Sequence, residues 1–186
     1  MQKSLRKSFF QLYGEMKGKF SFLLDGIVDI FRKFVKMSIM FLTRHMNAEL
    51  TELVFILDRS GSMGGLESDT IGGFNGIITK QKAQGKKVNV TTVLFDDEVD
   101  IIHDRFPVEI VEPLTEKEYF VRGCTALLDA VGRASEKMEN VQKHLQEDHR
   151  AGKIIFVITT DGLENSSEHF TQEQIRRKIE AKKECG

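Results

Sequence analysis

The sequence predicts an α/β fold in which a mostly parallel sheet is flanked by helices, and three observations lead to this class. Two short runs, residues 53–57 and 154–158, are continuously apolar and rich in β-branched and aromatic residues, which is typical of strands buried on both faces. Long helical patterns lie between the strands. Each run leads into an acid, Asp58 or Asp161, and ligand sites of open parallel sheets gather at the carboxyl ends of the strands.

The first expected helix covers residues 66–84. Its apolar residues recur on one face, and the pattern stops at Gly85, a residue that commonly ends helices. Three glycines lie inside it, Gly72, Gly73 and Gly76. Since glycine weakens a helix, we expect these positions to mark a close approach to a neighbouring strand or loop.

The next expected unit is a hairpin with an acidic turn. Residues 88–95 alternate as a strand does, and residues 99–103 return as the partner strand. The turn region carries four acids, Asp96, Asp97, Glu98 and Asp100. They lack the spacing and glycine of a hand-type calcium loop, so we expect a solvated turn. In all, the patterns predict strands at 51–57, 88–95, 99–103 and 153–159, and helices at 66–84, from 126 to 152 and from 171 to 186.

The loop after the first strand carries the chemistry. Asp58, Ser60 and Ser62 alternate there, so a tight loop can turn one carboxylate and two hydroxyls toward one point. Oxygen ligands of this kind suit Mg²⁺ far better than Zn²⁺. Taken alone, the triplet is equally compatible with an Asp and Ser turn that caps the following helix.

Two further stretches favour the metal site. The strand expected at 153–159 is followed by Thr160 and Asp161, which supplies a second carboxylate. Between the two strands, a loop containing Gly123 leads to Thr125 at the start of a long helical pattern. The loop, this hydroxyl and both acids could therefore meet at one edge of the sheet.

These residues resemble the von Willebrand factor A (vWA) domain with its metal-ion-dependent adhesion site. The resemblance covers about Glu49 to Gly186, and the family's D-x-S-x-S, Thr and Asp positions are filled by Asp58, Ser60, Ser62, Thr125 and Asp161. It implies a Rossmann-like fold in a protein-binding module that is not an enzyme. It also implies a Mg²⁺ or Mn²⁺ ion on these five residues, with an open position for a partner's Asp or Glu carboxylate.

The resembled fold has more strands than the four expected here, so the vWA domain, residues 47–186, looks incomplete at its C-terminus. The strand at 153–159 would then be a sheet edge, and a long apolar edge is an aggregation hazard. We expect residues 20–46 or a partner chain to cover it, with self-association through the edge as another outcome.

Residues 1–46 differ from the rest of the chain. Nine Lys and Arg stand against three Asp and Glu here, about +6, which leaves about −7 for the remainder. Apolar residues at helical spacing predict a basic amphipathic helical extension, too charged to span a membrane and without a signal-peptide cleavage pattern. We expect it to pack on the domain or to be read from an upstream start, with Met46 as the true beginning. Contact with an anionic membrane surface is the third alternative.

Other function classes find less support. A haloacid-dehalogenase-like phosphoryl-transfer enzyme could use Asp58 as nucleophile, but it would want an acid where Ser60 stands. Nucleic-acid binding is not expected, because residues 47–186 are acidic and carry no such motif. The two cysteines, Cys124 and Cys185, are too few for a disulfide framework, which favours a reducing, cytoplasmic location.

Overall fold

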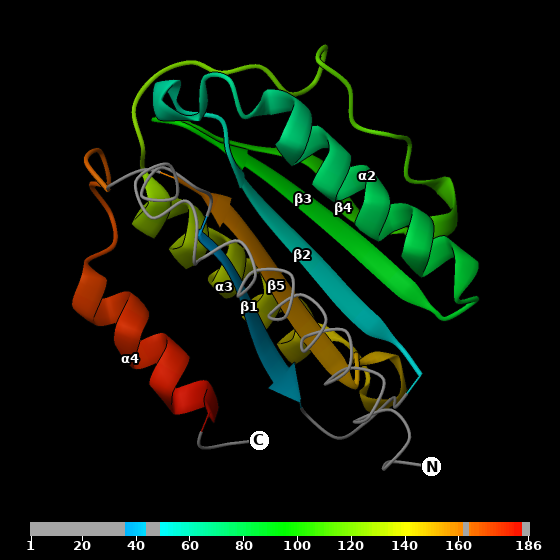
Figure 1. The fold of residues 1–186 in the computed structure, drawn as a ribbon. Helices are drawn as coiled ribbons and strands as arrows, with labels where there is room; N and C mark the ends of the chain where they lie inside the picture. Colours follow the sequence, from blue (N-terminus) through cyan, green and yellow to red (C-terminus); the bar gives the residue numbers. More distant parts are fainter. Residues whose placement is uncertain (1–35, 44–48, 162–163, 184–186) are drawn as a thin grey trace, which may run out of the picture. The chain divides into compact units, whose positions relative to one another are not determined.

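The computed structural model describes residues 36–43, 49–161 and 164–183. Its centre is a five-stranded mixed sheet with the order β1-β5-β2-β3-β4 (Figure 1). The strands are β1 Lys36–Thr43, β2 Thr51–Asp58, β3 Val88–Phe95, β4 Val99–Pro107 and β5 Lys153–Thr160. The central strands β5, β2 and β3 run parallel, whereas β1 and β4 pair antiparallel with their neighbours. The α/β class predicted from the apolar runs is therefore confirmed.

Helices cover both faces of the sheet, as Figure 1 shows. On one face α2, Glu67–Ala83, buries Phe74 and Ile78 against the side chains of β2 and β3. On the other face α3, Leu127–His144, buries Ala134 and Met138 against the alternate side chains of the same strands. The last helix, α4, Gln172–Lys183, packs on α3 through Ile175. Since β2 is buried on both faces, its continuous apolar run is explained.

The register brings the ends of the central strands to one edge. Asp58, the last residue of β2, lies opposite Phe95 on β3, and Leu57 lies opposite Thr159 on β5. The loops that follow β2, β3 and β5 therefore leave the sheet side by side. Residues on these three loops can therefore contribute to one site at this edge of the sheet.

All four strands predicted from the sequence are present, and β4 continues beyond the expected end at residue 103. The three expected helices are also present, although α3 ends at His144 and a short 3₁₀ turn follows at Glu147–His149. The expectation of close contacts at Gly72, Gly73 and Gly76 is wrong. A Cβ atom built at any of them would meet nothing within 4 Å.

The expected helical extension needs a correction, because residues Lys36–Thr43 form strand β1. This strand pairs along β5 from Lys36 opposite Thr160 to Thr43 opposite Lys153. The edge of β5, which residues 20–46 or a partner chain were expected to cover, is therefore paired by residues from the 20–46 stretch. The amphipathic helix predicted over residues 20–35 lies outside the described residues. Among the described helices, none combines the length and apolarity needed to cross a membrane.

Candidate metal centre

The five residues predicted to bind a metal come from four places at the carboxyl edge of the sheet. The first acid ends β2, two serines follow it in a loop that contains the 3₁₀ turn Gly61–Met63, a threonine lies just before α3, and the second acid follows β5. These residues are Asp58, Ser60, Ser62, Thr125 and Asp161.

Four of the five are joined by a chain of side-chain hydrogen bonds. The Ser62 hydroxyl donates to Asp161 Oδ1 over 2.8 Å, and Ser62 Oγ lies 3.1 Å from Ser60 Oγ. The Thr125 hydroxyl donates to Ser60 Oγ over 2.9 Å. Ser60 and Thr125 are buried, whereas Ser62 is exposed and Asp161 is half-buried. The cluster therefore opens to solvent on the side of Ser62 and Asp161.

The fifth residue, Asp58, lies at the bottom of the cluster and is fully buried. Its Oδ1 accepts the Ser60 N–H over 2.8 Å, and its Oδ2 accepts the Thr160 hydroxyl over 2.6 Å. Within the described part of the chain it forms no ion pair. Burial raises the pKa of Asp58, and the charge of Asp161 adds to this shift. The site thus holds a buried carboxylate whose counter-charge is not supplied by an Arg, Lys or His among the described residues.

The donor set fits a hard divalent cation. Two carboxylates and three hydroxyls offer oxygen atoms only, which is the chemistry that Mg²⁺ and Mn²⁺ accept. Neither at this site nor elsewhere in the described ranges are three His, Cys, Asp or Glu side chains grouped to hold a metal. An ion bound here would therefore depend on the hydroxyls of Ser60, Ser62 and Thr125 as well as on the acids.

Tyr119 fixes the backbone under the site, a role that the sequence did not reveal. It is almost fully buried, and its hydroxyl donates to the carbonyl of Asp58. Burial raises its pKa to about 12, so the hydroxyl keeps its proton at neutral pH. Two backbone hydrogen bonds complete the support, from Arg59 N–H to Phe95 C=O over 2.8 Å and from Gly61 N–H to Gly123 C=O over 3.1 Å.

Three acids of the turn after β3, Asp97, Glu98 and Asp100, are exposed as expected, but the expectation is wrong for Asp96, which is fully buried. Its Oδ2 accepts hydrogen bonds from Arg59 Nε over 2.8 Å and from Arg122 Nε over 2.6 Å. Burial alone would raise the pKa of Asp96, but these arginines and the N–H of Glu98 outweigh it and hold the pKa below its usual value. Composition could not show this, since the two arginines belong to distant loops.

Asn165, on the segment that follows β5, holds Thr125. Its Oδ1 accepts the Thr125 N–H over 2.9 Å, and its own backbone N–H donates to the Thr125 carbonyl over 3.1 Å. Beside it, Glu164 accepts the N–H of Leu128 in the first turn of α3 over 2.9 Å. The sequence indicated Thr125 only as a helix start, whereas the structure fixes its backbone from both sides.

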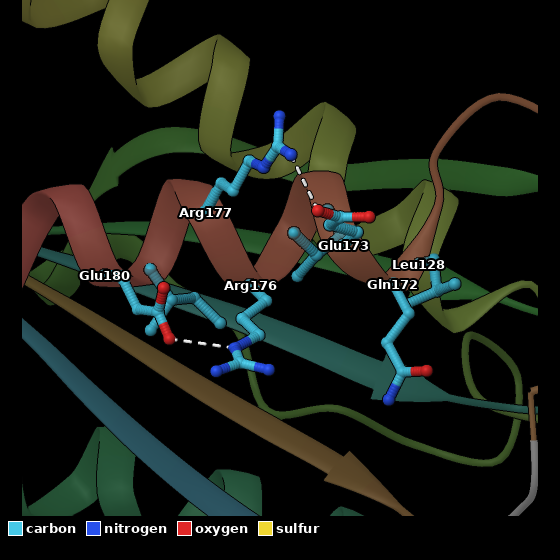
Figure 2. A pocket seen from close by; sticks show the side chains of 8 residues that line it. Leu128, Gln172, Glu173, Arg176, Arg177 and Glu180 are labelled. Atoms are coloured by element: carbon cyan, nitrogen blue, oxygen red, sulfur yellow. Dashed lines mark hydrogen bonds and ion pairs between the residues drawn. The ribbon is translucent and has the colours of Figure 1, made fainter.

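A separate hollow lies along α4 and is not part of this cluster (Figure 2). Its described lining consists of Leu128 and seven residues of α4, Gln172, Glu173, Ile175, Arg176, Arg177, Ile179 and Glu180. Two ion pairs within α4 balance the charges of the residues that line the hollow. Arg177 pairs with Glu173 at 2.6 Å, and Arg176 pairs with Glu180 at 2.8 Å. Such exposed i,i+4 pairs are typical of a solvated helix face.

No protein-family model and no curated protein matches this chain. Among solved structures, it is similar to three N-terminal domains of the type V pili tip protein Mfa5 from Porphyromonas gingivalis, with a TM-score of 0.43 and 14% identity over 57% of this chain and 24% of that one. It is also similar to proximal thread matrix protein 1 from the mussel byssus, with a TM-score of 0.36 and 12% identity over 79% of this chain and 47% of that one. The chain thus spans less than half the length of either structure.

Proposed function

We propose that this chain is a metal-dependent protein-binding module of the vWA type. In this proposal a Mg²⁺ or Mn²⁺ ion is held by Asp58, Ser60, Ser62, Thr125 and Asp161, and a partner's Asp or Glu carboxylate docks on the ion. The observation that carries the proposal is that side-chain hydrogen bonds join Ser60, Ser62, Thr125 and Asp161 beside Asp58, a buried carboxylate that lacks a cationic partner among the described residues.

Charge balance explains why a carboxylate would be the docking group. Asp58 and Asp161 together offset the two charges of the ion, while the three hydroxyls add oxygen ligands without adding charge. A bound ion supplies Lewis acidity toward one more anionic oxygen. Ser62 and Asp161 lie on the solvent side of the cluster, so a partner's side chain can reach the site from there.

The enzyme alternative fits less well, because Asp58 is fully buried and each of its oxygens accepts a hydrogen bond. A nucleophilic carboxylate needs an oxygen that can reach the substrate. The proposal therefore assigns no catalysis to this site. It places the module in the cytoplasm on the basis of cysteine usage.

Thermal unfolding of the full chain with Mg²⁺, with Mn²⁺ and with chelator tests the metal site. We expect saturable stabilisation of the wild type, about 2.7 kcal/mol at 100 times the dissociation constant, and none in Asp58→Ala or Asp161→Ala. Asp104→Ala is the matched control, since this exposed acid pairs with Lys137 away from the cluster. A folded wild-type chain that responds to neither ion would overturn the proposal.

Partner docking is tested by affinity capture on the immobilised chain with excess Mg²⁺. Captured proteins should elute with chelator while the chain itself stays folded. In a peptide derived from a captured protein, replacing the docking Asp or Glu by Asn or Gln should abolish binding. Equal binding with and without chelator would contradict carboxylate docking even if the ion binds.

A further inference from the structure

The loops that carry the five oxygen ligands are held together by one buried side chain. Asp96, the residue that follows β3, is fully buried and supplies none of the five ligand positions. Its carboxylate accepts a hydrogen bond from Arg59, which lies between Asp58 and Ser60 in the first ligand loop. It also accepts one from Arg122, which lies on the loop that leads to Thr125.

The backbone of the same residues reinforces this junction. The carbonyl of Asp96 accepts the N–H of Ala126, next to Thr125, over 2.8 Å. The Arg122 N–H donates to the Arg59 carbonyl over 2.7 Å, which links the two ligand loops directly. The strand end, the first ligand loop and the threonine loop are thus joined at one point.

The charges make this junction costly to disturb. The Arg59 side chain is only 4% exposed, so its guanidinium depends on Asp96 and on the half-exposed Asp100 for compensation. Charge-assisted hydrogen bonds of this kind are among the strongest in proteins. A buried arginine without its partner would move toward solvent, and it would carry Ser60 with it.

The geometry points to Asp96 as the positioning residue of the metal site: it sets the distance between the Asp58–Ser62 loop and Thr125 without touching the ion. This inference rests on the proposed function. Residues that orient metal ligands from behind typically change metal affinity about 10- to 100-fold when they are replaced.

Calorimetric Mg²⁺ titration of Asp96→Asn tests the inference, with Asp97→Asn as the matched control. Both variants remove one negative charge from the same turn. In the control, the amide oxygen of the new side chain can still accept the Cys124 N–H that Asp97 accepts over 3.3 Å. We expect Asp96→Asn to weaken Mg²⁺ binding at least about tenfold and the control to change it less than about threefold. Equal losses would mean that only charge matters, and would overturn the positioning role.

A second readout does not need the ion. In chelator, amide hydrogen exchange should speed up in Asp96→Asn at Arg59, Gly61, Arg122 and Ala126, whose N–H groups close the junction. The same amides should keep wild-type exchange rates in the control. Unchanged exchange in Asp96→Asn would overturn the inference.

Arg122→Gln provides a variant that should fold, since this side chain is 42% exposed. It removes one of the two arginines that donate to Asp96, so we expect a smaller loss of Mg²⁺ affinity than in Asp96→Asn. In the double variant with Asp96→Asn, the loss of binding free energy should be smaller than the sum of the two single losses. Additive losses would count against a shared junction. If wild-type protein binds no Mg²⁺, the proposed function and this inference both fail. If wild-type protein binds Mg²⁺ but Asp96→Asn matches the control, only this inference fails.

Discussion

Strand β2 carries a buried carboxylate near each end, and the two carboxylates have different kinds of hydrogen-bond partners. Near its start, Glu52 is fully buried and its Oε1 accepts hydrogen bonds from Arg105 Nη2 over 2.8 Å and from Asn89 Nδ2 over 3.0 Å. At its end, Asp58 is equally buried, but its partners in the described structure are the Ser60 N–H and the Thr160 hydroxyl. One acid has a cation from the chain, and the other has only neutral donors.

A third buried acid is compensated by hydrogen bonds from a segment that follows β5. Asp129, at the start of α3, accepts the N–H groups of Glu168, His169 and Phe170 and lies 2.9 Å from His169 Nδ1. Burial alone would raise the pKa of Asp129, but these hydrogen bonds lower it to about 2. At Asp58 burial prevails and the pKa is raised. Asp58 is therefore the less compensated of these two acids, as the proposed metal site requires.

Breaking the pair at the start of β2 should give the largest effect on stability. Arg105→Met keeps much of the stem but leaves Glu52 buried without its cation, which should cost about 3 kcal/mol in the free energy of unfolding. Urea denaturation measures this loss. Lys137→Met, which removes the 2.8 Å surface pair with Asp104, should cost less than about 1 kcal/mol. Similar losses in the two variants would mean that Glu52 does not depend on Arg105.

The contribution of Asp129 to the free energy of unfolding should depend on pH. The folded-state pKa of Asp129, about 2, is below the reference value of 3.8, so its ionised form stabilises the fold above pH 3.8 and this contribution is lost as pH falls through about 2. We expect Asp129→Asn to be less stable than wild type by about 2 kcal/mol near neutral pH. The difference should shrink on acidification. A gap independent of pH would point to packing alone.

The uncompensated acid should show the smallest effect on the fold without metal. In chelator, Asp58→Asn removes a buried charge but also one acceptor, so the free energy of unfolding should change by less than about 1 kcal/mol. Mg²⁺ should no longer stabilise this variant in a thermal unfolding assay. A large loss in chelator would show that the charge itself holds the loops.

The raised pKa of Asp58 has a matching consequence for pH. The folded state binds a proton here more readily than the unfolded state, so in chelator stability should fall as pH rises from 3.8 through the raised value. Asp58→Asn should lack this slope. Excess Mg²⁺ should remove it from the wild type, because a bound cation favours the ionised form.

The sequence by itself determined the elements that carry their own local pattern. The runs that became β2 and β5 were recognisable because strands buried on both faces are continuously apolar. The five oxygen donors could be named because they follow such strands or open a helix, and parallel strands bring those positions to one edge. The structure then brought Asp58, Ser60, Ser62, Thr125 and Asp161 together.

Only the tertiary structure decided what depends on partners distant in the chain. Lys36–Thr43 became a strand because β5 offered it an edge, a pairing that no local period encodes. In the sequence, Asp96 is one of four acids in a turn that was expected to be exposed. In the folded chain it is buried between Arg59 and Arg122. No sequence pattern indicated that Asn165 would accept a hydrogen bond from the Thr125 N–H. Burial and charge compensation are properties of groups that meet in space, so they become visible only after the chain has folded.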